Sequence, residues 1–175
     1  HYRHTKIRGV TKQTIFEAEL NFLEAKIAFE KKEFGEALGM LHNVSQFYAD
    51  NSGVFSEEAL YEKLLQIRIY LIWVYFLLDN YDDALKILDS TLDGDTKIKD
   101  SEFWSYYELF LAYRMFLRYY NKNLEKTQED LSSLNSMRLT DPEAKALVKL
   151  IEGIIAERNR DVRNAKKNLM EASKH

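Results

Sequence analysis

The chain has 175 residues, of which 46% are hydrophobic and 30% are charged. This length is enough to bury a core, and the composition is that of a globular protein rather than a disordered one. One Pro and six Gly are too few turn residues for a chain of many short strands. We therefore expect an all-α protein, in which long helices are joined by short polar turns.

Charge and residue usage exclude several classes of function. The net charge is −3, with a pI near 5.9, so we expect no nucleic-acid partner. The absence of Cys excludes disulfides, thiolate nucleophiles and Cys-bound zinc. No apolar run follows the basic first twelve residues, so no signal peptide is recognised and a cytoplasmic protein is expected. Residues 69–78 are apolar or aromatic throughout, but a membrane crossing needs about 20 such residues, so no membrane association is expected.

Hydrophobic periodicity predicts the order of the helices. Residues 1–10 show no period and are interpreted as a flexible basic lead-in. A first helix should begin near Thr14, which forms a T-x-x-E capping box with Glu17. From there we predict a single repeat domain over residues 11–175, with about eight helices paired in antiparallel hairpins. These hairpins should span about 14–49, 56–92, 101–135 and 141–174.

The central hairpin, 56–92, has the clearest signals for its helix ends. Ser56 should cap its first helix, which ends in the apolar run 69–78 and is followed by the polar break Asp79-Asn80. The last hairpin should begin at Asp141-Pro142, because Asp is a good N-cap and Pro suits the first helical position. We expect residues 159–161 (Asn-Arg-Asp) to form the turn of that last hairpin.

Three of the predicted turns share a pattern, which reads K-K-E-F-G-E-A-L, L-D-N-Y-D-D-A-L and N-R-D-V-R-N-A-K. Each has a polar turn, an apolar residue, two polar residues and then Ala, at positions 37, 84 and 165. The remaining turn has Thr127 at the Ala position. The pattern resembles the tetratricopeptide repeat (TPR), in which small residues allow two helices to pack closely. The resemblance covers about residues 14–174 and implies a short TPR-like α-solenoid. It is divergent and irregular, because Ala37 and Ala84 lie 47 residues apart where a regular array steps by about 34.

Catalytic patterns are missing. The four His residues are His1, His4, His42 and His175, three of them at the ends of the chain, so they suggest no metal site or catalytic triad. The chain has no Gly-rich phosphate loop and no nucleophile elbow. We therefore expect no enzyme, no cofactor and no metal.

The TPR resemblance implies a groove lined by the first helix of each hairpin. A groove this apolar would bind an amphipathic helix or an extended apolar peptide. The family's clamp for an acidic C-terminus requires Lys and Asn at positions where this chain has mostly aromatic or apolar residues, so such a ligand is not expected. The residues implied to bind a partner are Phe22, Lys26, Phe29, Ile69, Trp73, Phe76, Ala112, Phe116 and Tyr119.

Two questions stay open at this point. The aromatic residues of 101–120 could fill the core or line an open groove. The acidic segment 79–102 and the basic segment 158–174 could be ordinary solvated faces or contacts for a charged partner.

The sequence favours a non-catalytic scaffold or adaptor that binds a protein or peptide. The alternative is a regulatory or sensor domain of a larger signalling or transcription-regulating protein. The oligomeric state is left open.

Overall fold

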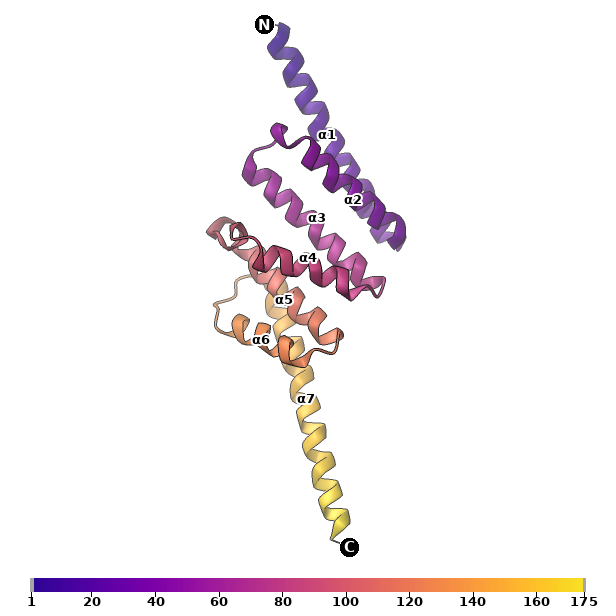
Figure 1. Cartoon of the computed structure of the whole chain (residues 1–175), viewed down its shortest axis with the longest axis vertical. Coiled ribbons are helices and arrows are strands. Elements are labelled where there is room, and N and C mark those ends of the chain that lie inside the picture. Colours follow the sequence, from indigo (N-terminus) through magenta and orange to yellow (C-terminus); the bar gives the residue numbers. More distant parts are fainter. Residues whose placement is uncertain (1, 175) are drawn as a thin grey trace. The chain divides into compact units, whose positions relative to one another are not determined.

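The computed structural model describes the backbone of residues 2–174 and the side chains of residues 11–174. Within these residues every regular element is a helix and no strand occurs, which confirms the all-α prediction. Contacts group the chain into two compact units, His1–Ile98 and Lys99–His175 (Figure 1). We call them the first and second unit and describe each by itself. The expectation of a single repeat domain stays a prediction.

The first unit contains four α-helices. They are α1 (Tyr2–Glu30), α2 (Phe34–Asp50), α3 (Glu57–Leu77) and α4 (Tyr81–Asp93). Successive helices pack against each other, and α1 also contacts α3. One cluster of the buried core is built from the first three helices: Ala18, Phe22, Ala25, Ala28, Ala37, Leu41, Val44, Tyr48, Ile67, Leu71 and Val74. Small residues on α1 let α2 approach closely, as the repeat pattern predicted.

Two helix starts in the first unit, those of α3 and α4, have the side-chain caps that the capping rules predict, whereas Glu33 before α2 makes no side-chain cap hydrogen bond. The Ser56 hydroxyl accepts a hydrogen bond from the backbone N–H of Ala59 at 3.1 Å, so the predicted cap of α3 is confirmed. The Asn80 side chain caps α4 in the same way, through the N–H of Asp83. In contrast, α1 begins at Tyr2 and not near Thr14. Residues 1–10 have no helical repeat of apolar residues, which indicates that the segment buries no apolar face. A segment without such a face can still form a helix. Side chains of residues 1–10 lie outside the described part, so the flexible lead-in expected there stays a prediction.

The second unit contains α5 (Trp104–Tyr120), α6 (Leu124–Asn135) and α7 (Pro142–Ser173). A short 3₁₀ turn, Ser101–Phe103, precedes α5, and two others lie at Ser52–Val54 in the first unit and at Lys97–Lys99 on the boundary between the two units in the sequence. Helix α5 is covered on nearly every side, since each residue from Glu108 to Leu117 is buried, and it contacts both α6 and α7. The buried carboxylate of Glu108 accepts hydrogen bonds from the backbone N–H groups of Thr140 and Asp141, at 3.1 and 2.9 Å. This carboxylate therefore ties the loop before α7 to α5.

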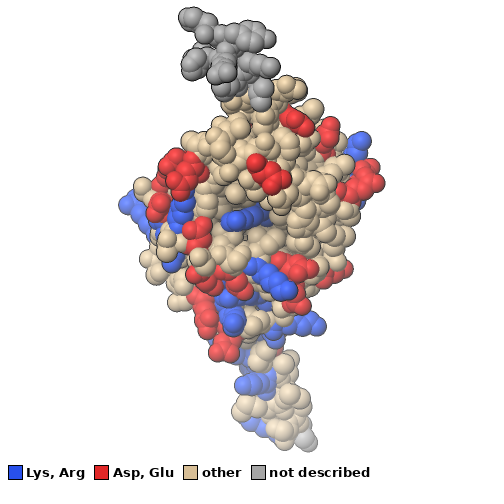
Figure 2. All heavy atoms as spheres, turned by 45° about the horizontal axis from the view of Figure 1, so that its top comes forward, with Lys and Arg blue, Asp and Glu red and all other residues tan. Residues whose placement is uncertain are grey.

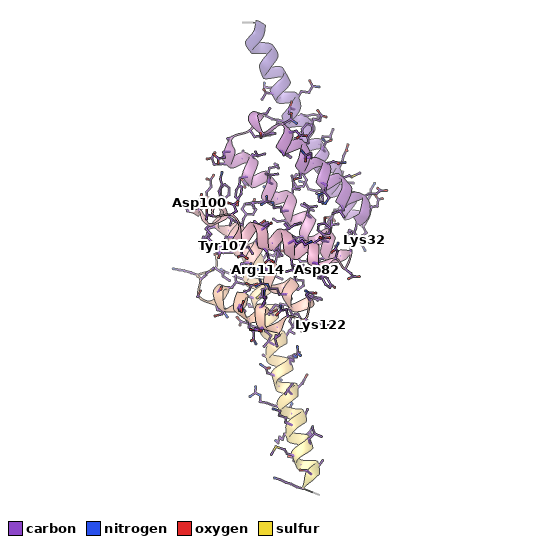
Figure 3. The ribbon with its side chains drawn as sticks, viewed as in Figure 1. Lys32, Asp82, Asp100, Tyr107, Arg114 and Lys122 are labelled. Carbon is purple, nitrogen blue, oxygen red and sulfur yellow. The ribbon has the colours of Figure 1, made fainter. Side chains whose placement is uncertain are left out.

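A buried ion network joins α5 to α6. Asp130, on α6, is 2% exposed, and its carboxylate accepts from Arg114 Nε at 3.2 Å and Arg114 Nη2 at 3.0 Å. Arg118 Nη1 donates to the same carboxylate at 2.8 Å. Figure 3 labels Arg114 on α5. One carboxylate thus holds two guanidinium groups between these helices.

The three hairpin turns share one backbone geometry. Each has a residue in the left-handed region: Lys32 (φ 63°), Asp79 (φ 58°) and Lys122 (φ 60°). Figure 3 labels Lys32 and Lys122 at two of these turns. The next residue's N–H bonds to a carbonyl five residues back, as in a Schellman motif, in the pairs Glu33 to Ala28, Asn80 to Tyr75 and Asn123 to Arg118. Five residues after the left-handed residue comes a fully buried small residue, Ala37, Ala84 or Thr127. The turn pattern read from the sequence is therefore a real structural repeat in these three hairpins.

The predicted fourth hairpin, 141–174, is wrong. Helix α7 is a single helix of 32 residues that passes through Asn159, Arg160 and Asp161 without a turn, so the described part has seven α-helices and not eight. A returning helix must bury an apolar face, as α2 does with Leu41, Val44 and Tyr48. The segment after Asp161 offers few large apolar residues on one face. Without that gain in burial, and without Gly or Pro, the backbone continues as a helix.

Candidate partner-binding surface

Helix α1 carries a second apolar face, which the rest of the first unit leaves uncovered. Its members recur at helical spacing and are Phe16 (67% exposed), Leu20 (41%), Leu23 (50%) and Ile27 (44%). We call this set the α1 stripe. The opposite side of the same helix supplies Ala18, Phe22 and Ala25 to the core. Because one side of α1 already fills the core, the α1 stripe has no partner within the described part of the first unit.

Two shallow depressions run along the seam between α1 and α2. Their volumes are about 190 and 220 Å³. Both are lined by Glu24 of α1 and Met40 of α2, and Met40 is 36% exposed. Ile27, a member of the α1 stripe, lines the larger depression. A row of apolar side chains beside a hollowed seam is a surface into which the side chains of another helix can fit.

Acidic residues outnumber basic ones from Phe16 onward. Residues 16–50, which include the C-terminal half of α1 and all of α2, hold seven acidic and three basic residues, and Lys12 lies one turn before Phe16. Glu17 directly follows Phe16, and Glu24 directly follows Leu23, so carboxylates flank the α1 stripe. A partner with basic groups beside its own apolar face would be favoured here.

A second uncovered surface lies on α7. The first half of this helix buries Ala144, Val148 and Ile151, but every residue from 156 to 174 is exposed. We call residues 156–174 the α7 extension. Its large apolar residues are Val162 (50% exposed), Leu169 (71%) and Met170 (65%). Residues 158–174 hold six basic and two acidic residues, and the narrow lower end of the molecule in Figure 2, which is this extension, shows mainly blue and tan.

The structure places the nine predicted binding residues in varied environments. Three are buried, namely Phe22, Ala112 and Phe116, and the other six, Lys26, Phe29, Ile69, Trp73, Phe76 and Tyr119, are half-buried. In the first unit, the Phe22 and Phe29 rings pack edge-on against Tyr70, with centroids 5.8 and 5.4 Å away. Lys26 Nζ lies 4.2 Å above the Phe22 ring. These residues form an aromatic cluster between α1 and α3, whereas the most exposed apolar residues of α1 are on its other side.

The remaining predicted residues fall in both units, so one continuous groove through all nine stays a prediction. In the first unit, Trp73 and Phe76 pack edge-on at 5.6 Å. In the second unit, Tyr119 lines a cleft of about 440 Å³ together with Tyr120, Lys122, Leu124 and Arg158. The Phe116 ring lies 4.7 Å from the Tyr120 ring. Helical spacing alone places the α1 stripe together with Phe22 and Phe29 in one broad apolar face, and none of the four stripe residues was among the nine predicted binding residues. The signal that distinguishes it is the presence of two apolar faces on one helix, only one of which α2 and α3 can cover.

Two further features are absent from the described residues. No group of three or more His, Asp or Glu side chains there is arranged to hold a metal ion. In the same residues, no helix combines the length and apolar character that a bilayer crossing requires. Comparison with known proteins returned no matching family model, no matching curated protein and no matching solved structure.

Proposed function

We propose that this chain is a non-catalytic protein-interaction module, built from TPR-like helical hairpins, that binds a helix of a partner protein on the outer face of α1 and α2. The observation that carries the proposal is the α1 stripe. Four large apolar side chains at helical spacing are each 41–67% exposed, beside two depressions. Exposed apolar surfaces of this kind on globular proteins usually mark contact sites for partners.

The three repeated turns support the TPR-like part of the proposal. A left-handed turn residue, a Schellman hydrogen bond and a buried small residue recur in the same order in each hairpin. Such a framework holds helices rigidly side by side. Rigid presentation of a helical surface lowers the entropy lost on binding, because few interface groups must be ordered.

A single charge placed in the α1 stripe tests the proposal. Leu23→Asp should leave folding intact, because Leu23 is 50% exposed. It should weaken binding of partners by at least about 30-fold, since loss of a central apolar anchor costs about 2 kcal/mol or more. The matched control is Leu150→Asp on α7, which makes the same substitution at a residue that is 48% exposed. Proteins captured from a cell extract by the wild-type chain are identified, and their affinities for all three forms are measured.

The expected result is loss of partners from Leu23→Asp and retention by Leu150→Asp, with unchanged circular dichroism spectra for both. Equal binding by both variants would show that the outer face of α1 and α2 is not the binding surface. Loss from both would point to a general effect of added charge.

A further inference from the structure

We propose that the α1 stripe of one copy of this chain is occupied by the α7 extension of a second copy, so that copies associate head to tail. This inference rests on the proposed function, because it names the helix that docks on the outer face of α1 and α2. Both surfaces belong to the same polypeptide, both are uncovered, and their shapes and charges are complementary.

The two surfaces match in length. The α7 extension carries its own stripe, Val162, Ala165, Leu169 and Ala172, at spacings of three, four and three residues. At about 1.5 Å per residue, this stripe spans about 15 Å, and the α1 stripe from Phe16 to Ile27 spans about 17 Å. Each apolar row can therefore be covered by the other along its whole length.

They also match in side-chain size. The α7 stripe alternates a larger residue with Ala, whereas every member of the α1 stripe is large. Ala side chains allow close approach of the helix backbone, so Phe16 and Leu23 of one copy can fill the spaces above Ala165 and Ala172 of the other. Packing of large residues against small ones is the usual way in which two helices fill the space between them.

Charge favours this pairing over the pairing of like surfaces. The α7 extension is basic, with six basic residues against two acidic ones in 158–174, whereas 16–50 has seven acidic residues against three basic ones. Lys166 lies one turn after Val162 on the same side of α7, and Glu17 and Glu24 flank the α1 stripe. Two α7 extensions brought together would place basic groups beside each other, which costs energy. Opposite charges would also make association stronger at low salt.

The contact would be small. One helix face against another buries less than the roughly 1,200 Å² typical of stable complexes, so a weak, concentration-dependent assembly is expected. Because the two surfaces differ, each association leaves one α1 stripe and one α7 extension free. Copies can then add further in an open chain, or close into a ring.

Sedimentation velocity of the full chain, from low micromolar to several hundred micromolar, tests the inference. The wild-type chain should show a mass that rises with concentration, and high salt should weaken the association at least tenfold. Leu23→Asp and Leu169→Asp should each reduce it at least tenfold. The matched control for Leu169→Asp is Asn164→Asp, about 140° around the same helix at 100° per residue, and it should associate like wild type. Leu150→Asp serves as the control for Leu23→Asp.

Mixing the two defective variants gives the sharpest outcome. The Leu169→Asp chain keeps an intact α1 stripe, and the Leu23→Asp chain keeps an intact α7 extension. The mixture should form a one-to-one dimer that does not grow, although each variant alone is monomeric. A wild-type chain that stays monomeric throughout, or a Leu23→Asp chain that still self-associates, would overturn the inference. If the wild-type chain is monomeric but Leu23→Asp still loses captured partners, the proposed function stands with a different partner helix.

Discussion

Replacing Asp130 by Ala tests whether the buried ion network holds the second unit together. The side chain of Asp130 is 4% exposed, and those of Arg114 and Arg118 are 11% and 12% exposed. The change removes the carboxylate that accepts from both guanidinium groups at 2.8–3.2 Å. Removing one partner from a buried ion pair costs about 3–5 kcal/mol, because the remaining charge keeps its desolvation penalty. We expect a loss of this size in the free energy of unfolding.

The two Trp residues allow each unit to be followed separately. Trp73 lies on α3 of the first unit, and Trp104 begins α5 of the second. Urea unfolding is measured by fluorescence in variants that keep one Trp, made by Trp73→Phe or Trp104→Phe. Asp130→Ala should shift the transition reported by Trp104 to lower urea. If this transition does not move, the network contributes little to stability.

A replacement without charges distinguishes the net contribution of the ion network to stability from the free-energy cost of leaving one of its charges unpaired. In the triple variant Asp130→Leu, Arg114→Met, Arg118→Met, no charge stays buried at this position. Apolar replacements of buried ion pairs are often neutral or stabilising, so this variant should be closer to wild type than Asp130→Ala. A triple variant as unstable as the single one would show that the hydrogen-bonded geometry, rather than an uncompensated charge, determines stability here.

Two further predictions concern the hairpins. Ala84→Leu should destabilise the first unit by about 1–3 kcal/mol, because Ala84 is fully buried and added volume overpacks the contact. Ala165→Leu should change stability by less than about 0.5 kcal/mol, since Ala165 is exposed on α7, and equal effects in urea unfolding would contradict the assigned repeat. Lys32→Gly should stabilise by about 0.5 kcal/mol, because Gly adopts the left-handed region without the usual steric cost. Lys32→Val should destabilise the first unit, and a reversed order of these two variants would contradict the role of the turn.

Local sequence predicted the three hairpin turns that the described part of the structure contains, at Lys32, Asp79 and Lys122. In these turns an apolar residue such as Phe34 or Tyr81 is followed three residues later by a small residue. This pair indicates a turn because both residues contact the preceding helix of the same hairpin. The same pattern at Val162 and Ala165 did not produce a turn. A hairpin also requires its second helix to bury an apolar face against the first. The segment after Ala165 has too little apolar surface to do so. A local pattern therefore indicates where a hairpin turn can form. Whether the turn does form depends on how much apolar surface the second helix can bury.

The binding surface was harder to predict than the fold. Phe16 and Phe22 are both aromatic residues of α1, yet Phe16 is 67% exposed and Phe22 is 1% exposed. Hydrophobic spacing shows that both lie on apolar faces, but it cannot show which face α2 and α3 will cover. That choice depends on where Ala18 and Ala25 permit close packing. The small residues, more than the large ones, determine which side of α1 faces inward.

The continuity of α7 has a consequence for local unfolding. A separate helix as short as the α7 extension would be marginal in water, because starting a helix fixes several residues for a single hydrogen bond. Here the packed first half, with Ala144, Val148 and Ile151 buried, serves as the nucleus, and the exposed half only has to propagate from it. Amide hydrogen exchange should therefore be slow near Ile151 and progressively faster toward Ser173. The extension is helical without being held by tertiary contacts, so warming would fray it from its C-terminal end first.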